Sequence, residues 1–401
     1  MRRGKGGTRR KLLNAAEKIL GKRGYNGASV SSICRQAGVA QGTFYRYFRN
    51  KEEIYLELVL LLEKFLRGKL LRAVSLENEP DRRLWAAFRA LLHGIEKRSR
   101  LYQIFREAEF VRMEIPKRFY SDLASIFREV LHQGVEGGFF RPLDPETVSF
   151  GILGIAEFIA MRYLLWKNSK ISPEALSTAK ELVFEGIDLD EKHYLIQEVE
   201  LPGDNKEESL EGGEATRKAL LRAAERLFGQ AGFHKTTVAE ITYVAGVAQG
   251  TFYLYFPSKT DIFVALVQEI NRELRWATRT AISGVSDRRD AECLGFQAFF
   301  KFISRHPEAY RIVREAEFVD KGIGRWYYQR LARAYARELG KAMERGEIRL
   351  MASEPLAYAL LGIGHFIGLR WIVWEHRERL PEAVLRDTLD FILHGIRGGG
   401  A

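Results

Sequence analysis

The chain has 401 residues, of which 46% are hydrophobic and 29% charged, and its formal net charge is +11 at pH 7. This length can form two to four domains with hydrophobic cores. No uninterrupted apolar run reaches the roughly 18 residues of a membrane span, since the longest candidate, residues 151–166, contains Glu157 and Arg162. The basic N-terminus is not followed by the apolar stretch of a signal peptide, and two cysteines are too few for a disulfide framework. We therefore expect a cytoplasmic protein and exclude the membrane and disulfide-rich classes.

The positive charge is concentrated near the N-terminus. Residues 1–51 contain 13 Lys and Arg and one acidic residue, Glu17, so their net charge is 13 − 1 = +12. Residues 209–259 contain six basic and four acidic residues, so their net charge is 6 − 4 = +2. Clustered Lys and Arg are typical of phosphate contact, although an isolated basic run can also be a solvated tail. Together with the motif described below, the cluster favours binding to nucleic acid.

A long-period repeat organises the chain. The string AGVAQGTFY begins at Ala37 and recurs letter for letter at Ala245, and 245 − 37 gives a period of 208 residues. The register persists, because residues 102–111 match residues 310–319 at the same spacing. Such a repeat indicates one unit duplicated whole. We expect helix-turn-helix domains at 1–51 and 215–259, helical regulatory domains at 52–200 and 260–401, and a linker at 201–214.

The front of each unit predicts two short helices before a turn. Apolar residues at helical spacing from Leu12 to Leu20 predict a first helix that ends near Gly24. Ser29 is expected to be the N-cap of the second helix. At the same place in the second unit, Thr237-Val-Ala-Glu forms a capping box.

A glycine and a third helix complete this segment. Gly38 and Gly246 lie where a tight turn needs a residue that tolerates positive φ. The third helix is expected from Ala40 or Gln41 to about Tyr47. Two helices joined by a short glycine-containing turn predict a helix-turn-helix.

The larger remainder of each unit is also helical in pattern. A long helix is expected from Glu52 to about Leu71, and prolines divide the following residues into four or five helices. No convincing alternating strand pattern occurs, which indicates an all-α protein. Residues 201–214 are acidic and rich in helix breakers, as a linker requires. The most apolar helices are expected near 145–167 and 173–189, with counterparts at 353–376 and 381–397.

The third helix sorts into an inner and an outer face. Phe44 and Phe48 are four residues apart and anchor the helix to its own core. Gln41 and Arg46 lie on the remaining surface, where Gln can pair with adenine and Arg with guanine. Gly42 removes bulk at a place where the helix must approach a groove closely. An aromatic-rich core helix is the alternative interpretation.

Neighbouring residues suit the phosphate backbone. The hydroxyl groups of Thr43, Tyr45 and Tyr47 can contact phosphate oxygens. Lys51 begins the next helix, where backbone amides and the helix dipole also favour a phosphate. The sequence therefore predicts a DNA-reading surface.

This pattern resembles the TetR family of bacterial transcriptional repressors. The resemblance rests on the core Gly-Val-x-x-Gly-Thr-aromatic-Tyr-x-x-Phe, on Lys-Glu-Glu-Ile at 51–54, and on the Ser/Thr cap of the second helix. It implies a three-helix DNA-binding domain and a helical ligand-binding and dimerisation domain in each unit. It places DNA contacts at Gln41, Gly42, Thr43, Tyr45, Arg46, Tyr47 and Lys51, and at Gln249, Gly250, Thr251, Tyr253, Leu254, Tyr255 and Lys259.

The chain departs from the family pattern because it holds two units. Family members usually have one unit and bind DNA as homodimers, so the resemblance implies an intramolecular pseudo-dimer joined through the last two helices of each unit. Small residues in these helices would allow close backbone approach, although they can equally serve packing within one unit. They are Gly151, Gly154, Gly362, Gly364 and Gly368.

The resemblance also implies an apolar pocket whose ligand releases DNA. Charged residues within apolar sequence need partners, which marks the repeated string Arg-Glu-Ala-Glu-Phe and the Arg and Trp that recur four residues apart. Structural ion pairs, such as Glu109 with Arg162, are the favoured alternative. Glu157 corresponds to His365, so the two pockets are expected to differ. The candidates are Arg106, Glu109, Phe110, Arg162, Trp166, Arg314, Glu317, Phe318, Arg370 and Trp374.

No metal or catalytic pattern stands out. The eight histidines have no metal-ligand spacing, and no catalytic triad or carboxylate pair is apparent, so we expect no metal, no cofactor and no enzymatic activity. The leading hypothesis is a repressor that binds a double-stranded operator and is released by a small apolar or amphipathic effector. An architectural DNA-binding protein without an effector, and a transcriptional activator, remain open.

Overall fold

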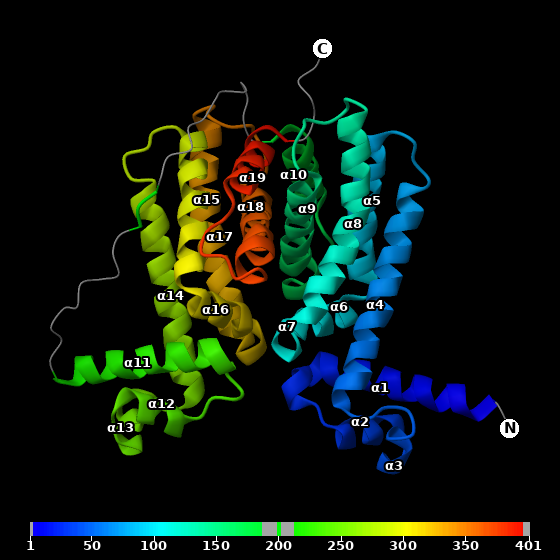
Figure 1. The fold of residues 1–401 in the computed structure, drawn as a ribbon, viewed down its shortest axis with the longest axis vertical. Helices are drawn as coiled ribbons and strands as arrows, with labels where there is room; N and C mark the ends of the chain where they lie inside the picture. Colours follow the sequence, from blue (N-terminus) through cyan, green and yellow to red (C-terminus); the bar gives the residue numbers. More distant parts are fainter. Residues whose placement is uncertain (1–2, 187–198, 202–211, 396–401) are drawn as a thin grey trace. The chain divides into compact units, whose positions relative to one another are not determined.

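A computed structural model describes residues 3–186, 199–201 and 212–395. Every regular element in these ranges is helical, as the sequence predicted (Figure 1). The chain separates into two compact units: unit 1 comprises residues 1–134 and 160–170, and unit 2 comprises residues 135–159 and 171–401. These units differ from the sequence repeat, because the helices of residues 145–159 and 173–185 come from the first repeat but belong to unit 2. The domain boundaries expected from the sequence remain predictions.

Unit 1 is a small helical head followed by a larger body. α4 starts where the Asn50 side chain accepts a hydrogen bond from the Glu53 amide, and one face of it, including Leu62 and Leu66, is buried. This helix joins head and body, because it packs on α1 at one end and on α5 and α6 further along. The helices are α1 (Arg3–Gly27), α2 (Val30–Ala37), α3 (Gln41–Phe44), α4 (Lys51–Val74), α5 (Pro80–Lys97), α6 (Ser99–Arg106), α7 (Ala108–Val111), α8 (Glu114–Glu136) and the π-helix η1 (Met161–Trp166).

Unit 2 repeats this plan and adds two helices from the first repeat. Its own head and body are α11 (Gly212–Ala231), α12 (Val238–Ala245), α13 (Gln249–Tyr255), α14 (Lys259–Ala281), α15 (Arg288–Arg305), α16 (Pro307–Val319), α17 (Lys321–Glu344), α18 (Ser353–Ile367), the π-helix η2 (Gly368–Val373) and α19 (Glu382–His394). The added helices are α9 (Pro145–Ala160) and α10 (Pro173–Glu185).

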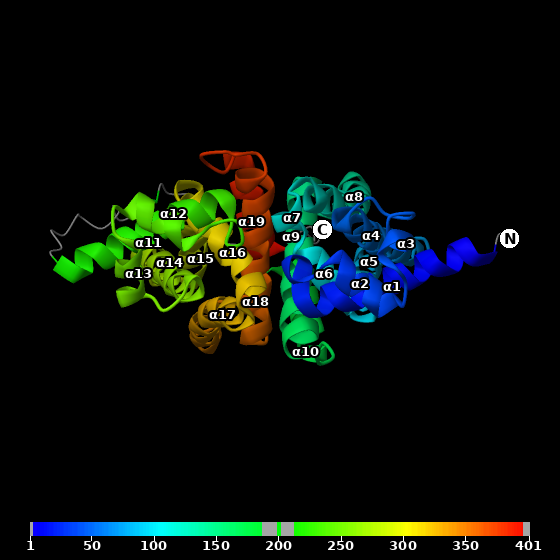
Figure 2. The same ribbon diagram turned by 90° about the horizontal axis from the view of Figure 1, so that it is seen from below.

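Within unit 2, α9 and α10 lie beside α18 and α19 (Figures 1 and 2). Gly154 of α9 and Gly362 of α18 face each other, and a Cβ on either would overlap the backbone of the other. Gly186, after α10, approaches the Leu393 backbone equally closely, and Gly395, after α19, approaches the Phe184 backbone. These reciprocal contacts join the last two helices of each repeat.

Two apolar helical stretches differ from the sequence expectation. Residues 145–166 and 353–373 are long and apolar enough to cross a bilayer, whereas no such run was expected from the sequence. The difference arises because a helical span tolerates a few charged residues, here Glu146, Glu157 and Arg162 in the first stretch. Most of each stretch is buried within the protein, as in the core helices of globular proteins.

Two boundaries also shift. The third helix of the first head is one turn, Gln41–Phe44, followed by a turn, whereas the sequence predicted helix to about Tyr47. α11 begins at Gly212, so the last three residues of the expected linker, 212–214, are helical. Residues 202–211 of that linker lie outside the described residues.

Candidate nucleic-acid interface

Local hydrogen bonds fix the helix-turn-helix of each head as the sequence predicted. The Ser29 hydroxyl accepts from the Ser32 amide at 3.1 Å, and the Ser32 hydroxyl accepts from the Ser29 amide at 3.1 Å. Thr237 and Glu240 form the corresponding capping box in unit 2. The turn glycines have positive φ, 66° at Gly38 and 70° at Gly246. These values strain any residue with a Cβ.

The reading helices bury their phenylalanines and expose the opposite face. Phe44 and Phe48 are buried in unit 1, as predicted, and Phe252 and Phe256 are buried in unit 2. In each head, the first two residues of the helix and the residues one and two after the first Phe are exposed: Gln41, Gly42, Tyr45 and Arg46, and Gln249, Gly250, Tyr253 and Leu254. These predicted DNA-contacting residues therefore form one solvent-facing surface on each head.

The remaining members of that surface are half-buried. Thr43 and Tyr47, with Thr251 and Tyr255, lie at its edges. A Cβ added at Gly42 or Gly250 would meet no atom within 4 Å, so the glycines leave open space on the outer face. Both heads have the same pattern of exposure, and they differ chemically where Arg46 corresponds to Leu254.

The lysines predicted to contact phosphate already have protein partners. The Lys51 ammonium donates to the carbonyl oxygens of Tyr25 at 2.7 Å and Ala28 at 3.0 Å, and it lies 4.2 Å from the centre of the Tyr25 ring. Lys259 repeats this arrangement in unit 2. Its ammonium donates to the Phe233 carbonyl oxygen at 2.8 Å and lies 4.3 Å from the centre of the Phe233 ring. Burial lowers the pKa of both lysines. Each ammonium keeps one N–H for a phosphate, so its DNA contact remains a prediction.

Two buried carboxylates complete this arrangement, in a role that the sequence pattern does not predict. The Glu107 carboxylate accepts a hydrogen bond from the Tyr25 amide at 2.7 Å. Glu315 accepts from the Phe233 amide with both oxygens at 3.2 Å. From the sequence, the repeated string that contains them predicts a ligand site instead. The peptide groups of residue 25 and residue 233 are thus held from two sides, at N–H by the body and at C=O by the first residue of α4 or α14.

The comparisons with known proteins identify the heads. The model for bacterial regulatory proteins of the tetR family matches residues 12–58 and again residues 220–266. The uncharacterized HTH-type transcriptional regulator YdgC of Bacillus subtilis (strain 168) is 32% identical over 164 residues, which are 39% of this chain and 82% of the relative. The chain belongs to the TetR family. It contains two tandem TetR units.

Other TetR-family relatives match one unit each. The HTH-type transcriptional repressor KstR2 of Mycobacterium tuberculosis (strain ATCC 25618 / H37Rv) is 30% identical over 147 residues, which are 35% of this chain and 73% of that protein. The match to the solved structure of KstR2 from the same species covers 43% of this chain and 89% of the KstR2 chain, with 25% identity and a TM-score of 0.36. The match to the solved structure of the fatty acid degradation regulator FadR of Bacillus halodurans covers 46% of this chain and 96% of the FadR chain, with 18% identity and a TM-score of 0.40.

Two ligand candidates of the second TetR unit, Arg314 and Glu317, lie in a buried polar cluster. The guanidinium of Arg314 donates to the Tyr310 carbonyl oxygen at 3.2 Å and lies 4.9 Å from the centre of the Tyr310 ring. The Tyr310 hydroxyl is 2.7 Å from Nδ1 of His365. Burial lowers the pKa of Arg314 to about 10, and burial together with Glu317 raises the pKa of Glu157 to about 8. Aromatic side chains surround the cluster, including Phe158 and Tyr328.

The ligand candidates of the first TetR unit differ in burial. Arg106 lies against Met161, with a guanidinium nitrogen 3.1 Å from the sulfur. Trp166 is buried, whereas Glu109, Phe110 and Arg162 are half-buried. Phe318, the counterpart of Phe110, is half-buried as well. A ligand contact by these residues remains a prediction.

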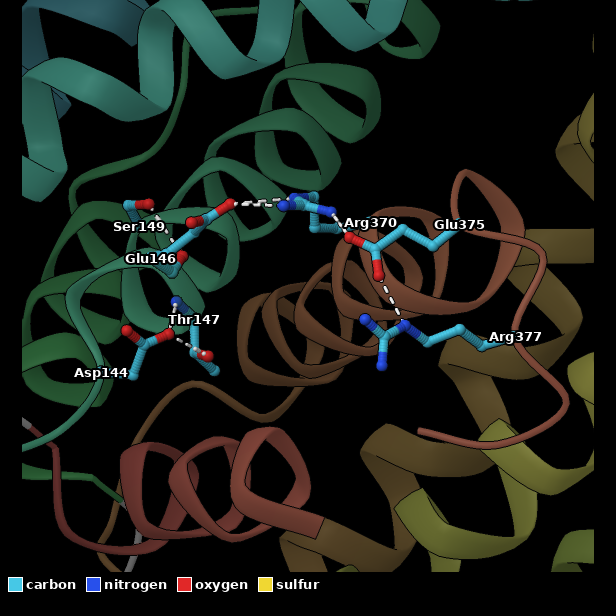
Figure 3. Close-up of polar contacts among 7 residues, drawn as sticks. All are labelled: Asp144, Glu146, Thr147, Ser149, Arg370, Glu375 and Arg377. Atoms are coloured by element: carbon cyan, nitrogen blue, oxygen red, sulfur yellow. Dashed lines mark hydrogen bonds and ion pairs between the residues drawn. The ribbon is translucent and has the colours of Figure 1, made fainter. Parts of the chain in front are cut away.

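Arg370 is engaged between the repeats. Its guanidinium donates to one Glu146 oxygen through Nε at 2.9 Å and through Nη2 at 2.8 Å, and it also binds Glu375 (Figure 3). Glu375 in turn accepts from Arg377 at 2.5 Å. Trp374 is buried beside Phe150 of α9. For Arg370, the alternative of a structural ion pair therefore agrees with the geometry, because its donors face carboxylates of the protein.

Asp144 fixes the start of α9 beside this ion-pair chain. Its carboxylate accepts from the Thr147 amide at 2.8 Å and from the Thr147 hydroxyl at 2.7 Å (Figure 3). Its amide donates to the Asp387 carboxylate of α19 at 3.0 Å. The position of Glu146, and hence of its partner Arg370, is thus set by the N-terminal cap of α9.

Proposed function

We propose that the protein is a transcriptional repressor in which one chain supplies both readers of one operator. The observation that carries this proposal is the duplicated reading surface, which presents Gln, Gly and Tyr at identical exposed places in two heads. Side-chain amides and guanidinium groups on such a surface can read base edges in the major groove. The relative KstR2 is named as a repressor, which supports this choice over the activator FasR of Mycolicibacterium smegmatis, of which the match covers 47%.

The joined C-terminal helices support the pseudo-dimer. In a homodimeric regulator two chains bring their last two helices together, whereas α9, α10, α18 and α19 belong to one chain here. A covalent connection raises the effective concentration of the halves to about the millimolar range. We expect the readers to lie about one DNA turn apart on the operator, roughly 34–36 Å.

A small apolar or amphipathic effector is the second part of the proposal. The cluster of Tyr310, Arg314 and His365 places polar groups inside an aromatic body, as a site for a ligand with one polar end requires. An architectural protein that coats DNA would not need such a cluster. We propose that the effector weakens operator binding.

Selection of bound DNA from a random library tests the proposal. We expect an imperfect palindrome, bound by one chain in native mass spectrometry. A selected site with a single half, or a complex of two chains on one palindrome, would contradict the shared operator. Mass spectrometry of the purified protein should also reveal a co-purified small molecule, and adding that molecule should weaken binding to the selected site.

A further inference from the structure

The two heads are attached to their bodies by equivalent but unequal contacts. In both, a buried carboxylate holds the amide that follows a glycine of positive φ: Glu107 holds Tyr25, just past the break that Gly24 makes within α1, and Glu315 holds Phe233, just past the end of α11. The glycine before this amide has a positive φ in both heads, 70° at Gly24 and 84° at Gly232. A Cβ on Gly24 would lie 3.0 Å from a Glu107 oxygen, so the chain passes close to the carboxylate.

In unit 2 a clamp by Arg311 reinforces this contact. Arg311 donates through one nitrogen to the carbonyl oxygens of Gly229 at 3.0 Å and Gln230 at 2.9 Å. These are terminal carbonyls of α11, which have no partner inside the helix and attract a cation through the helix dipole. The equivalent of Arg311 in unit 1 is Gln103, which makes no hydrogen bond to α1 in the described part of the chain.

The helix that carries the carboxylate also differs. Glu315 lies inside α16, which is a continuous helix of 13 residues. Glu107 lies at the break between α6 and α7, which are eight and four residues long. A break interrupts the backbone hydrogen bonds of a helix. The backbone at Glu107 is therefore held less firmly than the backbone at Glu315.

We propose that Glu107 and Glu315 are positioning residues for the two readers, and that Arg311 fixes the second reader while the first follows changes in its body. This inference rests on the proposed function, because it concerns how the readers meet DNA. Charge agrees with the division. The first reader carries +12 and can hold phosphate in several orientations, whereas the second carries +2 and depends on a fixed geometry.

Reciprocal substitutions in the full chain test the proposal. Arg311→Gln gives unit 2 the residue of unit 1, and Gln103→Arg gives unit 1 the residue of unit 2. Hydrogen exchange without DNA reports on the peptides around residues 25–28 and 233–236, because local opening exposes their amides. DNase protection of each half of the selected operator reports on reading. Arg311→Lys is the conservative control, since an ammonium can still donate to both carbonyl oxygens.

We expect amides near residue 233 to exchange at least about tenfold more slowly than those near residue 25. Arg311→Gln should abolish this difference in exchange and weaken DNase protection of one half-site about tenfold. Arg311→Lys should keep both the exchange difference and the half-site protection of the natural protein. Gln103→Arg should slow exchange near residue 25. Equal exchange in the natural protein, or unchanged half-site protection in Arg311→Gln, would overturn the proposal. If the random library yields no preferred site but the exchange difference persists, the repressor function fails and the unequal attachment stands.

Discussion

Gly154 and Gly362 meet backbone to backbone, so neither position has room for a side chain. The contact is reciprocal: each glycine faces the carbonyl group of the other across α9 and α18. One glycine comes from each repeat, at positions 208 residues apart. The close approach therefore belongs to the surface through which the two repeats are joined.

Alanine at either glycine should force these helices apart. We expect Gly154→Ala and Gly362→Ala to lower the free energy of unfolding by about 1–3 kcal/mol or more, because the overlapping atoms are backbone and cannot rotate away. Gly340→Ala is the matched control, since nothing lies within 4 Å of a Cβ there and alanine favours helix by about 0.5–1 kcal/mol. Urea unfolding measures all three variants. A stable Gly154→Ala protein would show that the helices separate readily.

The Glu146–Arg370 ion pair should stabilise the same surface. Its side chains are 31% and 23% exposed, and a two-point hydrogen bond joins them. A double-mutant cycle with Glu146→Gln and Arg370→Gln should give a coupling energy of about 1 kcal/mol. The exposed pair of Glu382 and Arg386 on α19 should give about 0.3–0.5 kcal/mol. Equal coupling energies for the two pairs would contradict a special role for Arg370.

Glu157 should make stability fall as the pH rises. Burial, aided by Glu317, raises its pKa to about 8 in the folded state. The folded protein therefore holds a proton that the unfolded chain has lost between about pH 4.5 and 8, and stability from this group is lost across that interval. The expected slope is about 1.4 kcal/mol per pH unit. Glu157→Gln should flatten the dependence of urea unfolding on pH between 6 and 8, and an unchanged slope would show that Glu157 is charged in the folded protein.

The first 51 residues should supply most of the non-specific DNA affinity. Deleting residues 1–7 removes three positive charges, Arg2, Arg3 and Lys5. Each lost phosphate contact should flatten the dependence of log K on log salt by about 0.9. Neutralising the exposed Arg279, Arg330 and Arg333 on α14 and α17 removes the same charge and should leave the slope unchanged. Equal slopes for the truncated and natural proteins would make the basic segment a passive tail.

The operator halves should differ where Arg46 and Leu254 project. Both side chains are exposed at equivalent positions, and Leu254 is 82% exposed. Arg46 can donate two hydrogen bonds to guanine, whereas Leu254 can contact a thymine methyl group. Arg46→Leu should cost about 1–3 kcal/mol and make the selected site more symmetric. Leu254→Arg should also make it symmetric while adding a guanine. A perfect palindrome for the natural protein would refute this interpretation.

The sequence by itself determined the repeat, the helical class and the local form of each head. Ser29 and Thr237 cap their helices and Gly38 turns the chain, as predicted, because these features depend on residues three or four positions apart. The burial of Phe44 and Phe48 agrees with their four-residue spacing, which Phe48 keeps beyond the end of α3 because its amide donates to the Phe44 carbonyl oxygen at 3.0 Å. Periodicity records such short-range requirements directly.

Only the tertiary structure decided how the repeated charges are used. The string Arg-Glu-Ala-Glu-Phe is identical in both repeats, yet it spans a helix break at Glu107 and lies inside a continuous helix at Glu315. Each of these carboxylates binds an amide 82 residues earlier in the chain, and Arg370 binds Glu146, which is 224 residues away. Pairing at such separations depends on which helices pack together, and helical spacing within a segment carries no information about that choice.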